Sequence, residues 1–133
     1  AVLNAGFTGH SAEVSGPLGN PVTARFAMRN ETAFIENAQA SGLSQLPGGK
    51  KDALHTSSFG TGQLIRAALD KGATRIILAM GGTATTDAGA GALQALGAKL
   101  RDAEGNEVSR GGASLIECVK ISELIEVNTI SKV

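Results

Sequence analysis

A glycine-rich stretch over residues 80–91 holds the side chains and backbone best suited to bind a charged ligand; its sequence is MGGTATTDAGAG. It follows an apolar run, residues 75–79, that predicts a buried strand, and it precedes residues 92–96, which predict a helix. Glycines let the backbone approach a ligand closely, and a helix start offers unpaired N–H groups and the positive end of its dipole. The stretch therefore predicts an anion-binding loop. Because neither Gly-Lys-Ser/Thr nor G-x-G-x-x-G occurs in it, its spacing identifies no particular ligand.

A second turn of small residues lies upstream, over residues 56–62, with the sequence TSSFGTG. It leads into a predicted helix over residues 63–71, because the apolar residues of that segment recur on one helical face. Thr61 is the expected N-cap of this helix, and Gly72 is expected to end it.

The whole pattern predicts a mixed sheet with helices packed on it, an α/β or α+β fold in one unit over residues 1–133. Residues 21–29 alternate between apolar and polar side chains, which is typical of a strand with one wet face. With strands at 12–15 and 32–35 they form an N-terminal antiparallel meander, whereas residues 1–10 predict no element. The other expected elements are a short helix over 37–43 that ends near Gly42, a loop at 46–51, a helix at 89–96 that ends at Gly97, a hairpin of 99–101 and 107–108 around 102–106, a helical turn at 114–118 and a final strand at 124–130.

Composition excludes several classes of protein. The 133 residues suffice for about one domain, and the formal net charge of zero argues against a nucleic-acid surface. The apolar runs are far shorter than a membrane span. A single cysteine, Cys118, excludes an internal disulfide and fits a reducing cytosol, so a cytoplasmic location is expected. His10 and His55 have no partner at metal-ligand spacing, so no metal site is predicted. Both ends of the chain are apolar and the first residue is not methionine, which suggests a piece of a longer protein.

Four motifs, in order, resemble those of the bacterial glycerate kinase family. Residues 16–19 (GPLG) and 35–43 (IENAQASGL) match its first two motifs, and residues 56–72 match its Thr-Ser-Tyr-Gly-Thr-Gly-Glu-Leu-Ile signature with the helix that follows. Residues 81–91 match its Gly-Gly-Ser-Ala-Thr-Asn-Asp-Gly-Gly-Ala-Gly loop. The departures are Phe59 for Tyr, Gln63 for Glu, Thr83 for Ser, Thr86 for Asn and Ala88 for Gly.

The resemblance implies a central, inserted domain of a two-domain α/β kinase, with both flanking parts of the other domain missing. The family moves the γ-phosphoryl group of ATP to a hydroxyl of D-glycerate, so ATP, Mg²⁺ and D-glycerate are the implied cofactors and substrate. Such transfer depends on positioning and charge neutralisation. The resemblance implies that the loop lines the cleft, although its glycines would also serve packing alone; the upstream turn either forms the opposite wall or only starts its helix. The implied ligand-binding residues are Ser57, Ser58, Gly60, Thr61, Gly81, Gly82, Thr83, Thr85 and Thr86.

Asp87 has two readings. It is the expected catalytic residue, holding Mg²⁺ or accepting the hydroxyl proton, and it is also well placed to cap the following helix. Glu36 and His55 are weaker candidates for substrate contact. The expected function is part of a glycerate kinase that is inactive alone, with the missing segments as partners and a homodimer as one arrangement. The alternative is a non-catalytic anion-binding or regulatory module with the same fold.

Overall fold

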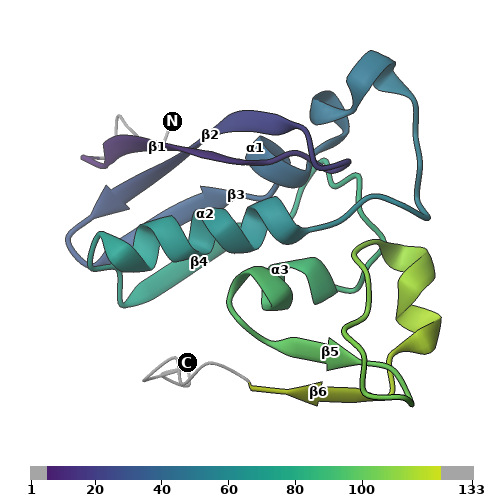
Figure 1. Cartoon of the computed structure of the whole chain (residues 1–133). Coiled ribbons are helices and arrows are strands. Elements are labelled where there is room, and N and C mark those ends of the chain that lie inside the picture. Colours follow the sequence, from purple (N-terminus) through teal and green to yellow (C-terminus); the bar gives the residue numbers. More distant parts are fainter. Residues whose placement is uncertain (1–5, 124–133) are drawn as a thin grey trace.

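A four-stranded mixed sheet dominates the computed structural model, which describes residues 6–123 (Figure 1). Its strands lie side by side in chain order: β1 (Thr8–Ser15), β2 (Pro21–Arg29), β3 (Thr32–Glu36) and β4 (Arg75–Ala79). The first three strands pair antiparallel, and β4 joins β3 in parallel. The predicted mixed sheet with an N-terminal meander is confirmed.

The alternation of β2 sets which face of the sheet is buried. Ala24, Phe26 and Met28 point into the core, while Arg25 on the other face is exposed. β1 begins at Thr8, so the expected start at residue 12 is wrong. The antiparallel ladder runs from Thr8 opposite Met28 to Ser15 opposite Pro21. Pairing with β2 therefore makes β1 longer than the strand that its own sequence pattern predicts.

The helices pack on the buried face of the sheet. α1 (Ala38–Ser41) and α2 (Phe59–Asp70) cover it, and Ile35 and Leu64, both fully buried, meet at the centre of this core. α1 ends at Gly42, as predicted. α2 begins at Phe59, so the prediction that Thr61 is its N-cap is wrong. Short 3₁₀ turns at Leu43–Gln45 and Pro47–Gly49 form the connection to α2.

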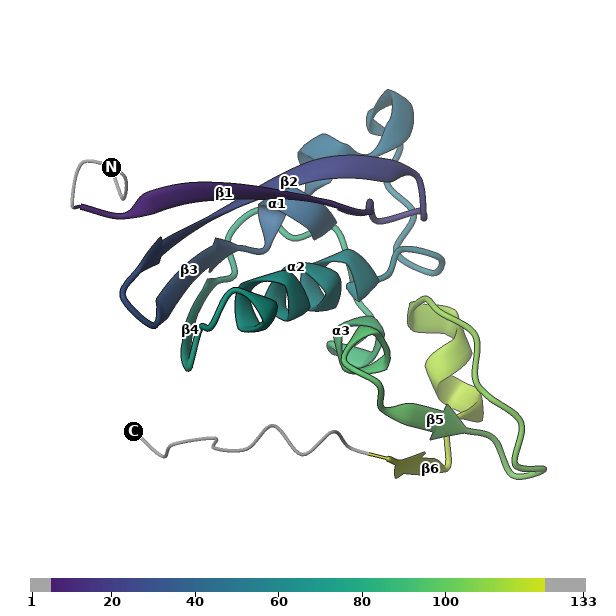
Figure 2. The same ribbon diagram turned by 60° about the vertical axis from the view of Figure 1, so that its left-hand side comes forward.

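A smaller unit of structure lies beyond α2, as Figures 1 and 2 both show. It contains α3 (Ala90–Ala95), a 3₁₀ segment (Gly112–Glu117) and the antiparallel pair β5 (Lys99–Arg101) and β6 (Lys120–Ser122). Four buried residues form its core: Ala90, Ala98, Leu100 and Val108.

The predicted elements of this unit are present in part. α3 matches the expected helix to within one residue at each end, and Gly97 follows it with a φ of 103°. The turn at 102–106 forms, closed by the Asp102 N–H donating to Asn106 O at 3.0 Å. The strand partner of β5 is β6, however, and residues 107–108 contribute only one bridge, Glu107 to Arg101. The strand expected at 124–130 lies outside the described residues.

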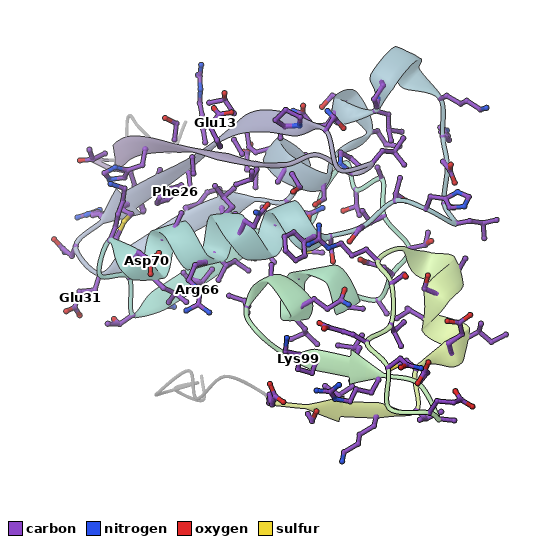
Figure 3. The ribbon with its side chains drawn as sticks, viewed as in Figure 1. Glu13, Phe26, Glu31, Arg66, Asp70 and Lys99 are labelled. Atoms are coloured by element: carbon purple, nitrogen blue, oxygen red, sulfur yellow. The ribbon has the colours of Figure 1, made fainter. Side chains whose placement is uncertain are left out.

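α2 and α3 approach each other closely because α2 has a glycine at the crossing. A methyl group on Gly62 would overlap the carbonyl of Ala92 and lie 2.7 Å from the Cβ of Ala95. Arg66, on the side of α2 that faces α3, donates from Nη2 to Leu96 O at 3.0 Å (Figure 3). Among residues 6–123, no helix has the length and apolar character that crossing a bilayer requires.

Candidate functional site

The glycine-rich loop lies at the carboxyl edge of the parallel strands. β3 and β4 end side by side, with Glu36 opposite Ala79, and residues 80–89 then connect β4 to α3. In open α/β sheets, ligands bind outside the carboxyl ends of parallel strands. The loop that the sequence predicts to bind a ligand therefore lies at the edge of the sheet where ligands bind in such folds.

Asp87 joins the loop to the upstream turn. Its side chain is buried, with 1% exposed, and Oδ2 accepts hydrogen bonds from Ser58 N–H at 2.7 Å and from Ser58 Oγ at 3.0 Å. Ser57 Oγ donates to the same oxygen at 3.3 Å. Two turns that are about 30 residues apart in sequence are thus held together by one carboxylate.

The same carboxylate occupies the start of α3. Gly91 N–H donates to Asp87 Oδ2 at 3.1 Å, and Gly89 N–H donates to Oδ1 at 3.2 Å. Ala92 N–H donates to Ser58 Oγ at 3.0 Å. The expectation of unpaired N–H groups at this helix start is therefore wrong. The N-cap residue is Gly89, not Asp87, although Asp87 satisfies the first turn through its side chain.

Ala88 occupies a left-handed backbone conformation, with a φ of 50°. Residues other than glycine reach this region at a cost in free energy, because Cβ then crowds the carbonyl oxygen. We expect Ala88→Gly to raise the free energy of unfolding by about 1 kcal/mol. Urea unfolding followed by circular dichroism would measure the change. Ala103→Gly, at an exposed turn position for which the structure records no positive φ, is the control and should not stabilise the protein; equal effects of the two changes would contradict the prediction.

The residues predicted in the upstream turn are buried. Ser57, Ser58 and Thr61 are at most 6% exposed, and a methyl group on Gly60 would overlap the carbonyl of Ser15. Their hydroxyls bond to Asp87 and, in the case of Thr61, to Asn37 Oδ1 at 2.6 Å. Within the described residues these groups contact other parts of the chain, and their predicted contact with a ligand stays a prediction.

The loop residues, in contrast, lie at the surface. Gly81, Gly82 and Thr86 are exposed, and Thr83 and Thr85 are half-buried. Thr86 Oγ1 donates to Ala53 O at 2.6 Å, and Thr83 Oγ1 donates to Met80 O at 2.9 Å. Across residues 6–123, no acceptor is recorded for the N–H groups of Gly82, Thr85 and Thr86. The loop can therefore offer backbone donors and hydroxyl lone pairs to a ligand.

Residues that the sequence did not single out surround the loop. Asn37, 2% exposed, donates from Nδ2 to Thr83 Oγ1 at 2.7 Å. A polar residue directly after the apolar strand β3 was the available signal for it. Arg110 stacks on the Phe59 ring, with Cζ 3.2 Å from the ring centroid. No spacing in the sequence relates these two positions.

His55 lies two residues after Ala53, whose carbonyl oxygen accepts the hydrogen bond from Thr86 Oγ1. Its Nδ1 is 2.8 Å from Asp52 Oδ1, and this hydrogen bond is the main reason why the pKa of the Asp52 carboxyl lies below its usual value. His55 is exposed and Asp52 is half-buried. In the part of the chain that the structure describes, no three His, Cys, Asp or Glu side chains form a group that could hold a metal ion.

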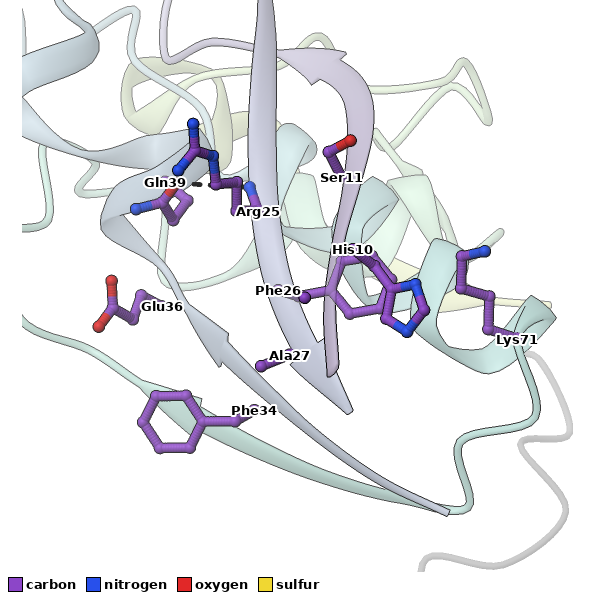
Figure 4. A pocket seen from close by; sticks show the side chains of 10 residues that line it. His10, Ser11, Arg25, Phe26, Ala27, Phe34, Glu36, Gln39 and Lys71 are labelled. Atoms are coloured by element: carbon purple, nitrogen blue, oxygen red, sulfur yellow. Dashed lines mark hydrogen bonds between the residues drawn. The ribbon is translucent and has the colours of Figure 1, made fainter. Parts of the chain in front are cut away.

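A separate hollow lies on the sheet. Figure 4 shows this cavity of about 760 Å³, which side chains of β1, β2 and β3 line together with Gln39 and Lys71. Glu36, a weaker candidate for substrate contact, lines it beside Phe34 and Arg25. None of the predicted residues of the two turns does, so the cavity and the loop are separate features.

The fold and the loop define an α/β protein with a glycine-rich loop at the carboxyl edge of a parallel strand pair. The model of the glycerate kinase family matches residues 1–131. Glycerate 2-kinase of Escherichia coli (strain K12) is 57% identical over 106 residues, which are 78% of this chain and 28% of the relative. Glycerate kinase of Bacillus subtilis (strain 168) is 51% identical over 110 residues, 81% of this chain and 29% of the relative.

A crystal structure from Salmonella typhimurium LT2, which carries the assignment glycerate kinase 2, superposes with a TM-score of 0.85. It is 48% identical and covers 90% of this chain and 33% of that one. The chain belongs to the glycerate kinase family. It spans between a quarter and a third of the length of these relatives.

Proposed function

We propose that the protein containing this chain transfers the γ-phosphoryl group of ATP to a hydroxyl of D-glycerate in the cytoplasm, and that this chain supplies one wall of the cleft. The observation that carries the proposal is the surface loop at residues 81–86 in a chain of this family: within residues 6–123, the N–H groups of Gly82, Thr85 and Thr86 have no recorded acceptor. The relatives from Escherichia coli and Bacillus subtilis are named glycerate 2-kinase and glycerate kinase, which supports glycerate as the substrate.

The loop would act by hydrogen bonding to negative charge. Gly81 and Gly82 carry no side chain that would keep a phosphate or carboxylate oxygen from their N–H groups, and Gly82 has a φ of 70°. In phosphoryl transfer, charge spreads over the oxygens of the moving group, and fixed donors stabilise it because they need no rearrangement. The hydroxyls of Thr83, Thr85 and Thr86 border the same surface.

Asp87 fits a positioning role better than a direct one. Its Oδ2 atom already accepts bonds from Ser57, Ser58 and Gly91, so metal binding would leave several buried donors without an acceptor. Among residues 6–123, no three His, Cys, Asp or Glu side chains form a metal-binding group, and the proposal assigns these residues no metal-binding role. Mg²⁺ bound with ATP would neutralise phosphate charge in the complete cleft. The catalytic role predicted for Asp87 stays a prediction.

The experiment compares the full-length protein with residues 1–133 alone. We expect the full-length protein to form phosphoglycerate when supplied with ATP, Mg²⁺ and D-glycerate, and the isolated chain to form none although it folds. A coupled assay for ADP and direct detection of phosphoglycerate would measure both.

Two results would contradict the proposal. Turnover by the isolated chain would show that it holds a complete site. A full-length protein that binds ATP but leaves glycerate unphosphorylated would favour the alternative, a non-catalytic anion-binding module. Circular dichroism of the isolated chain is the control that it is folded.

A further inference from the structure

A line of hydrogen bonds runs from the core of the sheet and helices, where it is buried, to the glycine-rich loop at the surface. Ser41 Oγ lies 2.7 Å from Thr61 Oγ1, which donates to Asn37 Oδ1 at 2.6 Å. Asn37 Nδ2 then donates to Thr83 Oγ1 at 2.7 Å, and Thr83 donates to Met80 O at 2.9 Å. Because Thr61 donates to Asn37, Ser41 is the donor in the first bond. The donor and the acceptor of each bond in the line are therefore determined.

Asn37 is the one member of this line that connects the core to the loop. Its amide accepts from α2 with one end and donates to the loop with the other, a combination that neither a carboxylate nor an apolar side chain offers. Its backbone is fixed as well, since Asn37 N–H donates to Ala79 O at 2.9 Å and Asn37 O accepts from Ser41 N–H at 2.8 Å. The residue is 2% exposed, and its bond with Thr61 is buried.

Two backbone bonds attach the loop on either side of Thr83 to the segment that follows Asn37. Leu43 N–H donates to Gly82 O, and Ala84 N–H donates to Ser41 O, each at 2.9 Å. These two bonds flank Thr83, so the Asn37 amide holds the middle of a turn whose two sides are held by backbone. The N–H groups of Gly82 and Thr85, which have no recorded acceptor within residues 6–123, lie directly beside these anchored residues.

We propose that Asn37 is a positioning residue that keeps the turn at residues 80–84 in its ligand-binding shape. It acts through Thr83 and contacts no ligand itself. Without its amide, the turn would keep only its two backbone bonds and the bond from Thr56 Oγ1 to Ala84 O at 3.0 Å, and the donors of Gly82 and Thr85 would lose their fixed direction. The consequence for phosphoryl transfer rests on the proposed function; the consequence for the loop does not.

The test measures amide hydrogen exchange in the full-length protein. In Asn37→Ala and in Asn37→Asp, which keeps the shape but removes the donor, we expect the amides of Leu43 and Ala84 to exchange about tenfold faster. The amides of β2 should be unaffected. Ser41→Ala is the matched control, because it removes a buried hydroxyl from the same line but keeps the Ser41 carbonyl that accepts from Ala84 N–H. Thr83→Val removes the same hydrogen bond from the loop side and should have the same effect on exchange as Asn37→Ala. It replaces the Asn37 variants in the test if these do not fold.

Steady-state kinetics supply the second measurement. We expect Asn37→Ala to lower kcat/KM for ATP or for glycerate about tenfold, while Ser41→Ala stays within about twofold. Faster exchange in the loop with unchanged kinetics would overturn the positioning role, and so would Asn37→Ala and Ser41→Ala giving equal exchange at Leu43 and Ala84. If the full-length protein does not phosphorylate glycerate at all, the proposed function fails separately. The positioning role of Asn37 is then tested by amide exchange and by the affinity for ATP, measured by calorimetry.

Discussion

Replacing Asp87 by alanine should lower the free energy of unfolding by about 4 kcal/mol, the largest effect that we expect from a single polar residue of this chain. The change leaves the N–H groups of Ser58, Gly89 and Gly91 without their acceptor. These groups lie in a buried or half-buried region, where an unsatisfied donor costs about 1–3 kcal/mol. Because the chain contains no Trp or Tyr, far-ultraviolet circular dichroism in urea is the suitable measurement.

Two further variants separate the hydrogen bonds of Asp87 from general effects of removing a carboxylate. Asp87→Asn should lower the free energy of unfolding by about half as much as Asp87→Ala. Its amide oxygen keeps one acceptor, but its NH₂ group would place a donor against the donors of Ser58 or Gly91. Asp70→Ala removes an exposed carboxylate from the end of α2 and should change the stability by no more than about 0.5 kcal/mol (Figure 3). Equal losses for Asp70→Ala and Asp87→Ala would contradict the arrangement described for Asp87.

Replacing Gly62 by alanine should destabilise the protein by roughly 2–3 kcal/mol, although alanine is the better helix former by about 1 kcal/mol. The sign of the effect is what tests the structure. A methyl group at this position would overlap the backbone of α3 at Ala92, so α2 and α3 would have to move apart. Thermal unfolding of both forms would measure the difference.

The control is the same change at a position with room for a methyl group. Gly81 has no atom within 4 Å of where its Cβ would lie and no positive φ, so Gly81→Ala should alter stability by no more than about 0.5 kcal/mol. A neutral or stabilising Gly62→Ala would show that the two helices are further apart than described.

The sequence predicts those elements whose own residues carry the pattern. The alternation of β2 and the glycines after α1 and α3 are local features, and the structure confirms them. The start of β1 at Thr8 and the strand β6 have no such pattern, because pairing with β2 and with β5 decides them. The early start of α2 has a similar cause: its first turn is held by Asp87, a residue that lies much further along the chain.

The candidate site divides in the same way. The position of the loop between a strand and a helix follows from its glycines and from the flanking periodicity. The partners of its side chains do not, since Asp87 with Ser58 and Asn37 with Thr83 are contacts between distant segments. A buried polar pair has no signature in a single sequence, because the same residue types occur at exposed positions with equal ease.

The parallel pairing of β3 with β4 also bears on the order in which the protein folds. β1 and β2 form a hairpin around a short turn, whereas β4 can pair only after residues 37–74 have been brought back beside β3. Closing such a long segment costs conformational entropy before any contact is gained, so pairings of this kind form late and slowly. The glycine-rich loop follows β4 directly and should therefore be among the last parts of the chain to reach its native conformation.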